Sequence, residues 1–244
     1  MPKFFVPPED IGDEELWIRE DAHHLLHVLR QGPGDTVLVC DGEGTDYSCV
    51  IEAAEADGLC CRIEKREASA AEPSLRIALF QGIPKAEKLE WIIQKNTELG
   101  VDRVIPVETR RSVVHLEEKK RKGKEERWRK IAAAAAKQSG RGRIPKVAAV
   151  CSFSAMLREL PQYERAIVLY EDETGVSLKQ CLSEWQKPQS VALLIGPEGG
   201  WDPEEIRQLK EAGAVTAGLG PRILRTETAG QTAVAAVLYH YDEM

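Results

Sequence analysis

From residue 75 onward, short apolar runs typical of β-strands alternate with longer amphipathic runs typical of α-helices. A helix after each strand is the connection that parallel neighbours require. The alternation predicts an α/β fold with a mostly parallel sheet that is covered by helices on both faces. The predicted strands span residues 75–81, 103–107, 146–150, 166–170, 191–195 and 215–219, and the predicted helices span residues 86–99, 124–138, 153–160, 178–185, 203–211 and 227–241.

Residues 1–70 have a different pattern, in which short strand-like runs are separated by Gly- and Asp-containing turns. Such a pattern is typical of a small antiparallel sheet or barrel. We therefore expect two domains, residues 1–70 and residues 71–244, with a polar linker near residues 66–73. The elements predicted in the first domain are a helix over residues 20–29 and strands over residues 36–40, 47–54 and 59–65.

The charge is unevenly distributed along the chain. The formal net charge is −7, which by itself argues against a nucleic-acid partner. Residues 110–146, however, contain a large excess of Lys and Arg over Asp and Glu. Such a local excess on an otherwise acidic protein indicates a polyanion site, although a solvated basic helix would have the same composition.

Several classes of protein are not expected. The chain has no uncharged apolar run close to the roughly 20 residues that span a bilayer, and its first ten residues do not resemble a signal peptide. None of the six cysteines forms a Cys-x-x-Cys pair, so we expect reduced cysteines in a cytoplasmic protein. His23 and His27 have a metal-compatible spacing but lack a zinc-protease signature, and we expect no metal and no membrane.

Two glycine-rich turns each follow a predicted strand near the C-terminus. The first is Gly196-Pro197-Glu198-Gly199-Gly200, and the second begins with Gly218-Leu219-Gly220-Pro221-Arg222. Glycines at the end of a strand bring bare backbone close to a ligand, and the following helix offers free N–H groups. If the two strands are parallel neighbours, the turns would form a cleft at the carboxyl edge of the sheet.

The composition of these turns limits the choice of ligand. Neither turn is a Walker A loop, and neither is a complete Gly-x-Gly-x-x-Gly dinucleotide motif. Glu198 would repel a pyrophosphate group, whereas a nucleoside needs close backbone approach but no anion cradle. The turns are therefore compatible with a cofactor such as S-adenosylmethionine, although many α/β proteins use similar turns for packing alone.

The same region resembles the RNA methyltransferases of the trefoil-knotted SPOUT superfamily. The resemblance rests on residues 195–200 and 219–229, and it is strongest to the branch that methylates N3 of a uridine in small-subunit ribosomal RNA. Lys85-Ala86-Glu87-Lys88-Leu89-Glu90 with residues 94–101 resembles the first helix of that branch, and Gln138-Ser139-Gly140-Arg141 resembles its Glu-Gln-Ser-x-Arg motif. Lys137 departs from the pattern, which usually has Glu there.

The N-terminus supports the same branch. Phe4-Phe5-Val6 and residues 24–30 resemble its small N-terminal RNA-binding barrel, which is similar to PUA domains. The resemblance implies a mostly parallel sheet with a C-terminal trefoil knot, preceded by a PUA-like β-barrel, in a cytoplasmic homodimer. It implies S-adenosylmethionine as cofactor, and 16S ribosomal RNA or the small ribosomal subunit as substrate. Two alternatives stay open: a knotted methyltransferase that acts elsewhere, such as on a tRNA ribose 2′-hydroxyl, and a non-catalytic RNA-binding protein of ribosome assembly.

The resemblance and the positions of charged residues together give a set of candidate site residues. The candidate catalytic residues, which would orient the uracil, stabilise its anion or take its proton, are Arg141, Arg225 and Glu227. The expected cofactor-binding residues are Leu169, Glu171, Ile195, Gly196, Pro197, Gly200, Leu219, Gly220, Ile223, Leu224, Arg225, Thr228 and Ala229. The expected RNA-binding residues are Arg19, His24, Arg30, Lys85, Lys88, Arg110, Arg111, Arg141 and Arg143, with His115 as a further phosphate contact.

Overall fold

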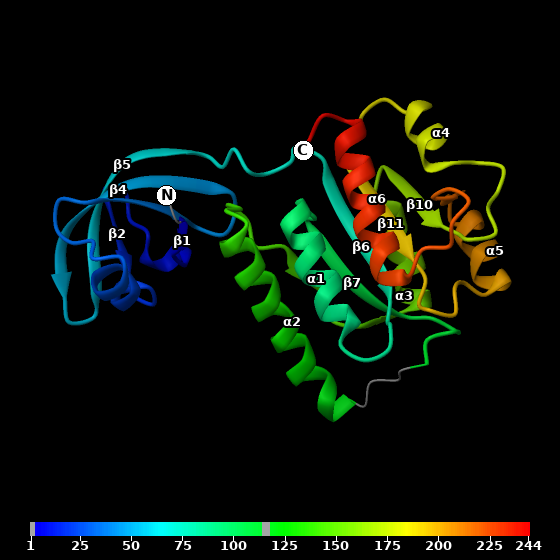
Figure 1. Cartoon of the computed structure of the whole chain (residues 1–244), viewed down its shortest axis with the longest axis horizontal. Coiled ribbons are helices and arrows are strands. Elements are labelled where there is room, and N and C mark those ends of the chain that lie inside the picture. Colours follow the sequence, from blue (N-terminus) through cyan, green and yellow to red (C-terminus); the bar gives the residue numbers. More distant parts are fainter. Residues whose placement is uncertain (1–2, 114–117) are drawn as a thin grey trace. The chain divides into compact units, whose positions relative to one another are not determined.

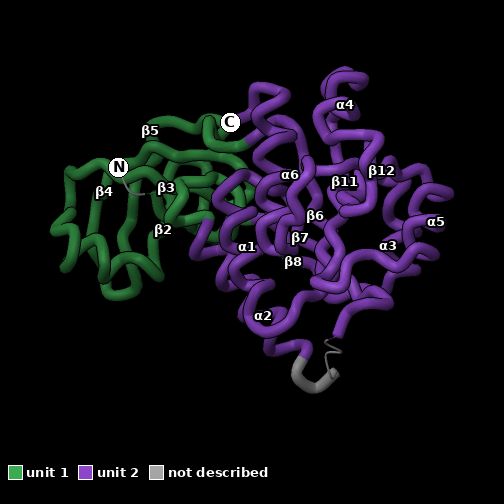
Figure 2. Tube along the Cα trace, turned by 45° about the vertical axis from the view of Figure 1, so that its right-hand side comes forward, with its two compact units in different colours: residues 1–72, 136–144 green, residues 73–135, 145–244 purple. Residues whose placement is uncertain are grey.

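The computed structural model describes residues 3–113 and 118–244, and the chain divides into two compact units (Figure 2). The N-terminal unit comprises residues 1–72 and 136–144, and the C-terminal unit comprises residues 73–135 and 145–244. The short segment 136–144 therefore packs with the first unit although it lies far along the chain. This packing is not visible in the local sequence pattern, because it depends on contacts between distant residues.

The N-terminal unit contains a five-stranded sheet in the order β1-β3-β4-β5-β2. β1 is parallel to β3, and the other pairs are antiparallel. The sequence pattern missed β1 and β2, which are only three and four residues long. The strands are β1 (Lys3–Phe5), β2 (Glu15–Ile18), β3 (Thr36–Cys40), β4 (Thr45–Glu55) and β5 (Gly58–Ala68).

The core of this unit forms from alternate side chains of the strands. Val37 and Val39 of β3, for example, are buried on the same face of the sheet. Leu25, in the π-helical turn η2 (His24–Val28), also packs into this core. The turn is shorter than the helix predicted over residues 20–29. The helix cannot continue past η2, because Arg30 has a left-handed φ of 57° and a Gly-Pro-Gly sequence follows. A 3-10 turn, η1 (Pro8–Asp10), joins β1 to β2.

The C-terminal unit confirms the predicted α/β class. Its seven-stranded sheet has the order β12-β10-β11-β6-β7-β8, β9 pairs with β7, and all of these pairs are parallel. Of the strand predicted over residues 146–150, only residues 146 and 147 form a strand, and a second two-residue strand begins just after it at Cys151. The strands are β6 (Arg76–Gly82), β7 (Arg103–Glu108), β8 (Lys146–Val147), β9 (Cys151–Ser152), β10 (Arg165–Leu169), β11 (Ser190–Ile195) and β12 (Val215–Ala217).

Six α-helices are described in the chain (Figure 1). Those that contribute to the larger apolar core, on one face of the sheet, are α1, α2, α4 and α6, while α3 and α5 contribute to the core on the other face. Leu79 and Phe80 of β6 face opposite cores, as expected for a strand buried on both sides. The helices are α1 (Lys88–Leu99), α2 (Glu118–Gln138), α3 (Phe153–Glu159), which continues into the 3-10 turn η3 (Leu160–Gln162), α4 (Leu178–Ser183), α5 (Pro203–Glu211) and α6 (Thr226–His240). The trefoil knot stays a prediction from the family resemblance.

The start of α5 is held by a buried carboxylate. Asp202 is the N-cap of this helix, and Glu205 completes a capping box by accepting a hydrogen bond from the Asp202 N–H at 3.1 Å. The second oxygen of Glu205 accepts the Arg110 N–H at 2.9 Å, which ties the segment after β7 to the helix. Glu205 is only 1% exposed, so water cannot replace it as the partner of these two donors.

We expect Glu205→Ala to lower the free energy of unfolding by about 1–3 kcal/mol, because it leaves two N–H donors without an acceptor. Urea unfolding followed by tryptophan fluorescence measures this change. Glu204→Ala is the matched control, since Glu204 lies one residue earlier on α5 but pairs with Arg207 at the surface. Equal destabilisation by the two substitutions would contradict the role given to Glu205.

Candidate functional site

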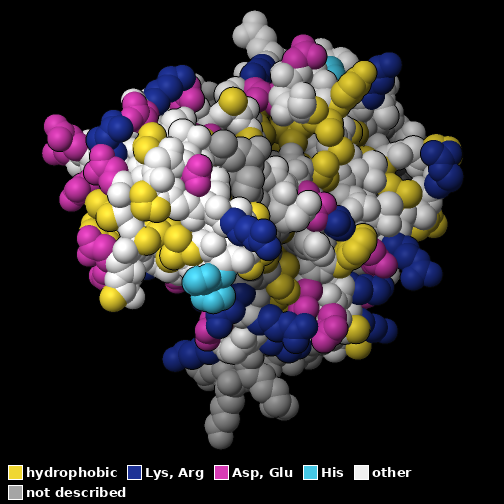
Figure 3. All heavy atoms as spheres, turned by 60° about the vertical axis from the view of Figure 1, so that its left-hand side comes forward, with side chains coloured by type: hydrophobic (Ala, Val, Ile, Leu, Met, Phe, Trp, Pro, Cys, Tyr) yellow, Lys and Arg dark blue, Asp and Glu magenta, His cyan; other side chains and the backbone are white. Residues whose placement is uncertain are grey.

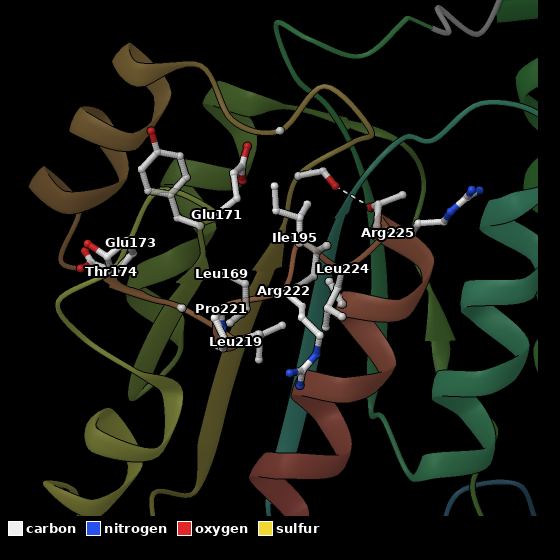
Figure 4. A pocket seen from close by; sticks show the side chains of 18 of the residues that line it. Leu169, Glu171, Glu173, Thr174, Ile195, Leu219, Pro221, Arg222, Leu224 and Arg225 are labelled. Atoms are coloured by element: carbon white, nitrogen blue, oxygen red, sulfur yellow. Dashed lines mark hydrogen bonds between the residues drawn. The ribbon is translucent and has the colours of Figure 1, made fainter.

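A cavity of about 850 Å³ lies at the carboxyl ends of β10 and β11 and beside the loop that follows β12 (Figure 4). The expectation that the two glycine turns follow neighbouring strands is wrong, because β10 lies between β11 and β12. β10 adds its last residue, Leu169, to the wall, and the segment that follows it adds Tyr170 and Glu171. The site is thus built from three strand ends, as is common in open α/β sheets.

The first turn can pack as it does only because two positions are glycine: Gly200, within the turn, and Gly82, at the end of the neighbouring strand β6. Gly200 has a left-handed φ of 68°, and a Cβ atom there would lie 1.9 Å from the Glu171 Oε1 atom. A Cβ atom on Gly82, at the end of β6, would lie 2.6 Å from the Pro197 backbone nitrogen. These close approaches let the backbone of residues 196–200 pack directly on the neighbouring strand ends.

The second turn is supported by a carboxylate outside the predicted set. Glu173 accepts hydrogen bonds from the Thr216 hydroxyl and from the N–H groups of Gly175 and Val176, and these bonds lower the pKa of Glu173. A Cβ atom on Gly218 would lie 2.5 Å from the Glu173 carbonyl oxygen. Glu173 therefore holds the loop after β10 against the turn that begins at Gly218.

The floor of the cavity is apolar. Leu169, Ile195, Leu219 and Leu224 project side by side from the strand ends and from the second turn (Figure 4). Backbone N–H and C=O groups of the two turns surround this floor. An apolar slot bordered by backbone polar groups suits a flat heteroaromatic ring, which needs burial of its faces and hydrogen bonds along its edge.

A buried hydrogen-bond network connects the first turn to the start of α6. The Thr226 hydroxyl donates to the Gly196 carbonyl oxygen at 2.6 Å and accepts from the Gln81 side-chain amide at 2.8 Å. Gln81 is fully buried at the end of β6. The sequence pattern gave no signal for Gln81 beyond a polar residue at the end of an apolar strand.

A cluster of charged residues borders the cavity near the start of α1. The Lys88 ammonium lies 3.0 Å from a Glu198 oxygen and 3.4 Å from Glu227 Oε2. The hydrogen bond to Glu198 raises the pKa of Lys88, so it stays charged at neutral pH. Burial alone would raise the pKa of Glu198, but hydrogen bonds from the Lys88 ammonium and the Lys85 N–H bring it below its usual value.

The structure brings most of the candidate cofactor-binding residues together. All of them line the cavity except Thr228, which lies on α6 between the lining residues Thr226 and Ala229. Arg225 is a lining residue, but its side chain extends away from the apolar floor (Figure 4). Glu227 does not line the cavity itself, but its Oε2 atom lies 3.4 Å from the ammonium of Lys88, which does.

Arg141 has a different environment from the other candidate catalytic residues. It lies in the N-terminal unit and is only 3% exposed. Its guanidinium donates to both oxygens of Glu72, at 3.2 and 2.7 Å. Glu72 also accepts the N–H groups of Gly142 and Arg143, so it organises the whole turn around Arg141. Sequence reasoning did not select Glu72.

Several candidate RNA-binding residues already have partners. Arg19 pairs with Asp10 and Asp57, and the side chain of Arg143 donates to the Glu43 carbonyl oxygen. In the C-terminal unit, Arg110 pairs with Asp202, and Arg111 donates to the Gly199 carbonyl oxygen.

Other basic residues are open to solvent. His24, Arg30 and Lys85 are exposed, whereas His115 lies outside the described residues. On the face shown in Figure 3, Lys and Arg side chains gather in the lower part of the view, around the described part of α2. Lys137, the departure from the family pattern, bonds to Asp21 at 2.6 Å within the N-terminal unit.

Two further observations concern the described residues only. No three His, Cys, Asp or Glu side chains among them gather in a way that could hold a metal ion. None of the described helices has the length and apolar character needed to cross a bilayer.

Comparison with known proteins places these observations in a family. The RNA methyltransferase domain family matches residues 71–238, and the RNA methyltransferase PUA domain family matches residues 19–64. The ribosomal RNA small subunit methyltransferase E of Bacillus subtilis (strain 168) is 39% identical over 224 residues, which cover 90% of this chain and 88% of the relative. The protein of the same name from Mycobacterium bovis is 33% identical over 234 residues, 93% of this chain and 87% of the relative.

The fold is also similar to that of solved structures. A ribosomal RNA small subunit methyltransferase E from Neisseria gonorrhoeae, bound to S-adenosyl methionine, superimposes with a TM-score of 0.82 at 28% identity, over 98% of this chain and 97% of that one. The PUA domain match lies within the N-terminal unit, and most of the RNA methyltransferase domain match lies within the C-terminal unit. The chain therefore belongs to the RNA methyltransferase family that includes ribosomal RNA small subunit methyltransferase E.

Proposed function

We propose that this protein transfers a methyl group from S-adenosylmethionine to N3 of a specific uridine in 16S ribosomal RNA. The observation that carries the proposal is the cavity itself, in which an apolar floor is bordered by glycine-rich backbone and by the Glu171 carboxylate. These groups suit a nucleoside that has no phosphate. The names of the relatives support ribosomal RNA as the substrate, and the family resemblance supports N3 of uridine.

The residues present fit the adenosine half of the cofactor. Leu169, Ile195, Leu219 and Leu224 would bury the adenine, while backbone groups near Gly196 and Gly220 bond to its edge. Glu171 would accept hydrogen bonds from the ribose hydroxyls, a role in which its charge is favourable because no phosphate is near. A pyrophosphate in the same place would meet Glu171 and Glu198, so a dinucleotide is a poor fit.

When bound, the cofactor supplies an activated methyl group on a sulfonium centre. The chain has to align the acceptor with this group and to help remove the N3 proton. Arg225 and Glu227 lie at or next to the cavity, so we propose that they act on the acceptor base. We propose the same for Arg141, which would reach the acceptor from the second copy of a homodimer.

The RNA would bind through basic side chains of α2 and of the N-terminal unit, such as His24 and Arg30. Phosphate contacts by these residues set affinity and register, while an unpaired uridine enters the cavity. A protein that binds this substrate would act in the cytoplasm, with the small ribosomal subunit.

Product analysis tests the proposed reaction. The purified chain is incubated with S-adenosylmethionine and either free 16S RNA or small subunits, and the digested nucleosides are identified by mass spectrometry. We expect N3-methyluridine at one position. Methylation of a ribose 2′-hydroxyl would favour the related knotted methyltransferases, and the absence of any methylated product with both RNAs would favour a non-catalytic RNA-binding role.

The fit of the cofactor predicts that Gly200→Ala weakens binding of S-adenosylhomocysteine at least about tenfold, or about 1.4 kcal/mol. The new methyl group would displace Glu171 from its place beside the first turn. Isothermal titration calorimetry measures the affinity. Gly213→Ala is the matched control, since Gly213 is also left-handed, with a φ of 89°, but has open space around it and lies outside the cavity lining. Equal losses of affinity in the two variants would contradict this fit.

The proposed RNA surface predicts a steep salt dependence. We expect the association constant for 16S RNA to fall about tenfold or more between about 50 and 200 mM salt. Replacing the exposed Lys122 and Lys124 of α2 with Gln should make this dependence shallower, whereas Lys179→Gln on α4 should not. Filter binding at several salt concentrations measures the slope. A flat response in the unmodified protein would exclude the basic segment as the RNA site.

A further inference from the structure

The charged cluster beside the cavity contains one carboxylate that its surroundings do not satisfy. Glu198 accepts hydrogen bonds from both Lys85 N–H and Lys88 Nζ. Glu227 Oε2, by contrast, is buried and makes no hydrogen bond within the described part of the chain, and the Lys88 ammonium lies 3.4 Å away, an ion-pair distance without hydrogen-bond geometry. A buried carboxylate oxygen in this state is costly, and functional sites are where such groups persist.

Lys88 connects this carboxylate to the cavity. Lys88 lines the cavity, and its ammonium contacts Glu198 and Glu227. An ammonium has three N–H donors, so one donor is left over from the two carboxylate contacts seen among the described residues. The cavity wall here thus offers a cationic donor, with the Glu227 carboxylate 3.4 Å from it.

The uracil base carries hydrogen-bonding groups that are complementary to the ammonium of Lys88 and the carboxylate of Glu227. The Watson–Crick edge of uracil presents a carbonyl oxygen, the N3–H group and a second carbonyl oxygen, which accept, donate and accept hydrogen bonds in turn. A lysine next to a carboxylate matches two adjacent positions of this edge, with the carboxylate opposite the N3–H. General bases act from such hydrogen-bonding positions.

We propose that Lys88 and Glu227 together bind and deprotonate the imide edge of the target uridine. Lys88 donates to O4 of uracil, and the Glu227 carboxylate takes the N3 proton. As the N3–H bond breaks, the N3 electron pair forms the bond to the methyl carbon. The bond from methyl to sulfur breaks at the same time, and its electrons return to sulfur. Glu227 then releases the proton to water.

The same pair would select against cytidine. Cytosine has no proton on N3 and carries an amino group, a donor, where uracil has O4. Lys88 would then face a donor and Glu227 would face a lone pair, so both charges would be left without partners. The inference rests on the proposed function, because it assumes that N3 of a uridine is the acceptor.

Single-turnover methylation at saturating RNA and cofactor tests the pair. We expect Glu227→Gln to slow the reaction by about 10²–10⁴-fold, while its affinity for S-adenosylhomocysteine changes by less than about twofold. Without the base, the rate should rise by about tenfold per pH unit, since hydroxide must take the proton. RNA that contains 5-fluorouridine, whose N3 proton is more acidic, should recover much of the lost rate in this variant. A structural defect would not respond to the acidity of the substrate.

Lys88 and Lys95 form a matched pair of substitutions on α1. Lys88→Met should slow the saturated reaction by about tenfold or more, and Lys88→Arg should retain more of the rate because it keeps a cationic donor. Lys95→Met removes a charge from the same helix, where Lys95 pairs with Glu98, and should leave the saturated rate within about twofold of that of the unmodified protein. Equal slowing by Lys95→Met and Lys88→Met would overturn the assignment of Lys88.

Different results would contradict the proposed function and the proposed roles of Lys88 and Glu227. If the unmodified protein makes no N3-methyluridine, the proposed function fails and this inference fails with it. If the unmodified protein makes N3-methyluridine and Glu227→Gln reacts within about threefold of its rate at every pH, only the inference about Lys88 and Glu227 is overturned.

Discussion

The hydrogen bond from the Thr226 hydroxyl to the Gly196 carbonyl oxygen joins the two turns that form the site. Gly196 begins the first turn, and Thr226 is the first residue of α6, directly after the second turn. The buried amide of Gln81 bonds to the same hydroxyl and thereby adds the end of β6. Because all three groups are buried, loss of one partner would leave the others unsatisfied. The shape of the cavity therefore depends on this small network.

The charged residues of the two units differ in how completely they are paired. Glu173 and Glu205 hold loops in place through backbone N–H groups, and Glu72 does the same for the turn that contains Arg141. Lys88 and Glu227 lie next to the cavity with fewer partners than these supporting groups have. Carboxylates with complete sets of donors stabilise the scaffold, whereas an incompletely paired one is available to react.

Much of the fold could be predicted from the sequence, because its signals are local. The start of α5 follows from Asp202, Pro203 and Glu205, and the strand predicted over residues 191–195 was confirmed as β11 with one additional residue. The strand order could not be predicted, since β10 is inserted between β11 and β12 by packing of distant segments. The short strands β1 and β2 were missed for a similar reason: pairing with β3 and β5 stabilises them more than their own composition does.

The residues of the candidate site also divide into those that the sequence predicts and those that only the three-dimensional structure reveals. The glycine turns and their neighbours were found because close backbone approach requires glycine at positions such as Gly200. Gln81 and Glu72 were missed, since a buried polar residue gives no periodic signal and only its partners reveal its role. Lys88 was selected as an RNA contact, and the two carboxylates beside it became visible only in three dimensions.

The central claim is that the cavity at the ends of β10 and β11 holds the nucleoside half of a methyl donor. A crystal structure of the protein with S-adenosylhomocysteine tests this claim most directly. The account predicts adenine against Leu169, Leu219 and Leu224, with the ribose hydroxyls bonded to Glu171. Adenine bound elsewhere on the protein, or a ribose turned away from Glu171 toward solvent, would contradict it.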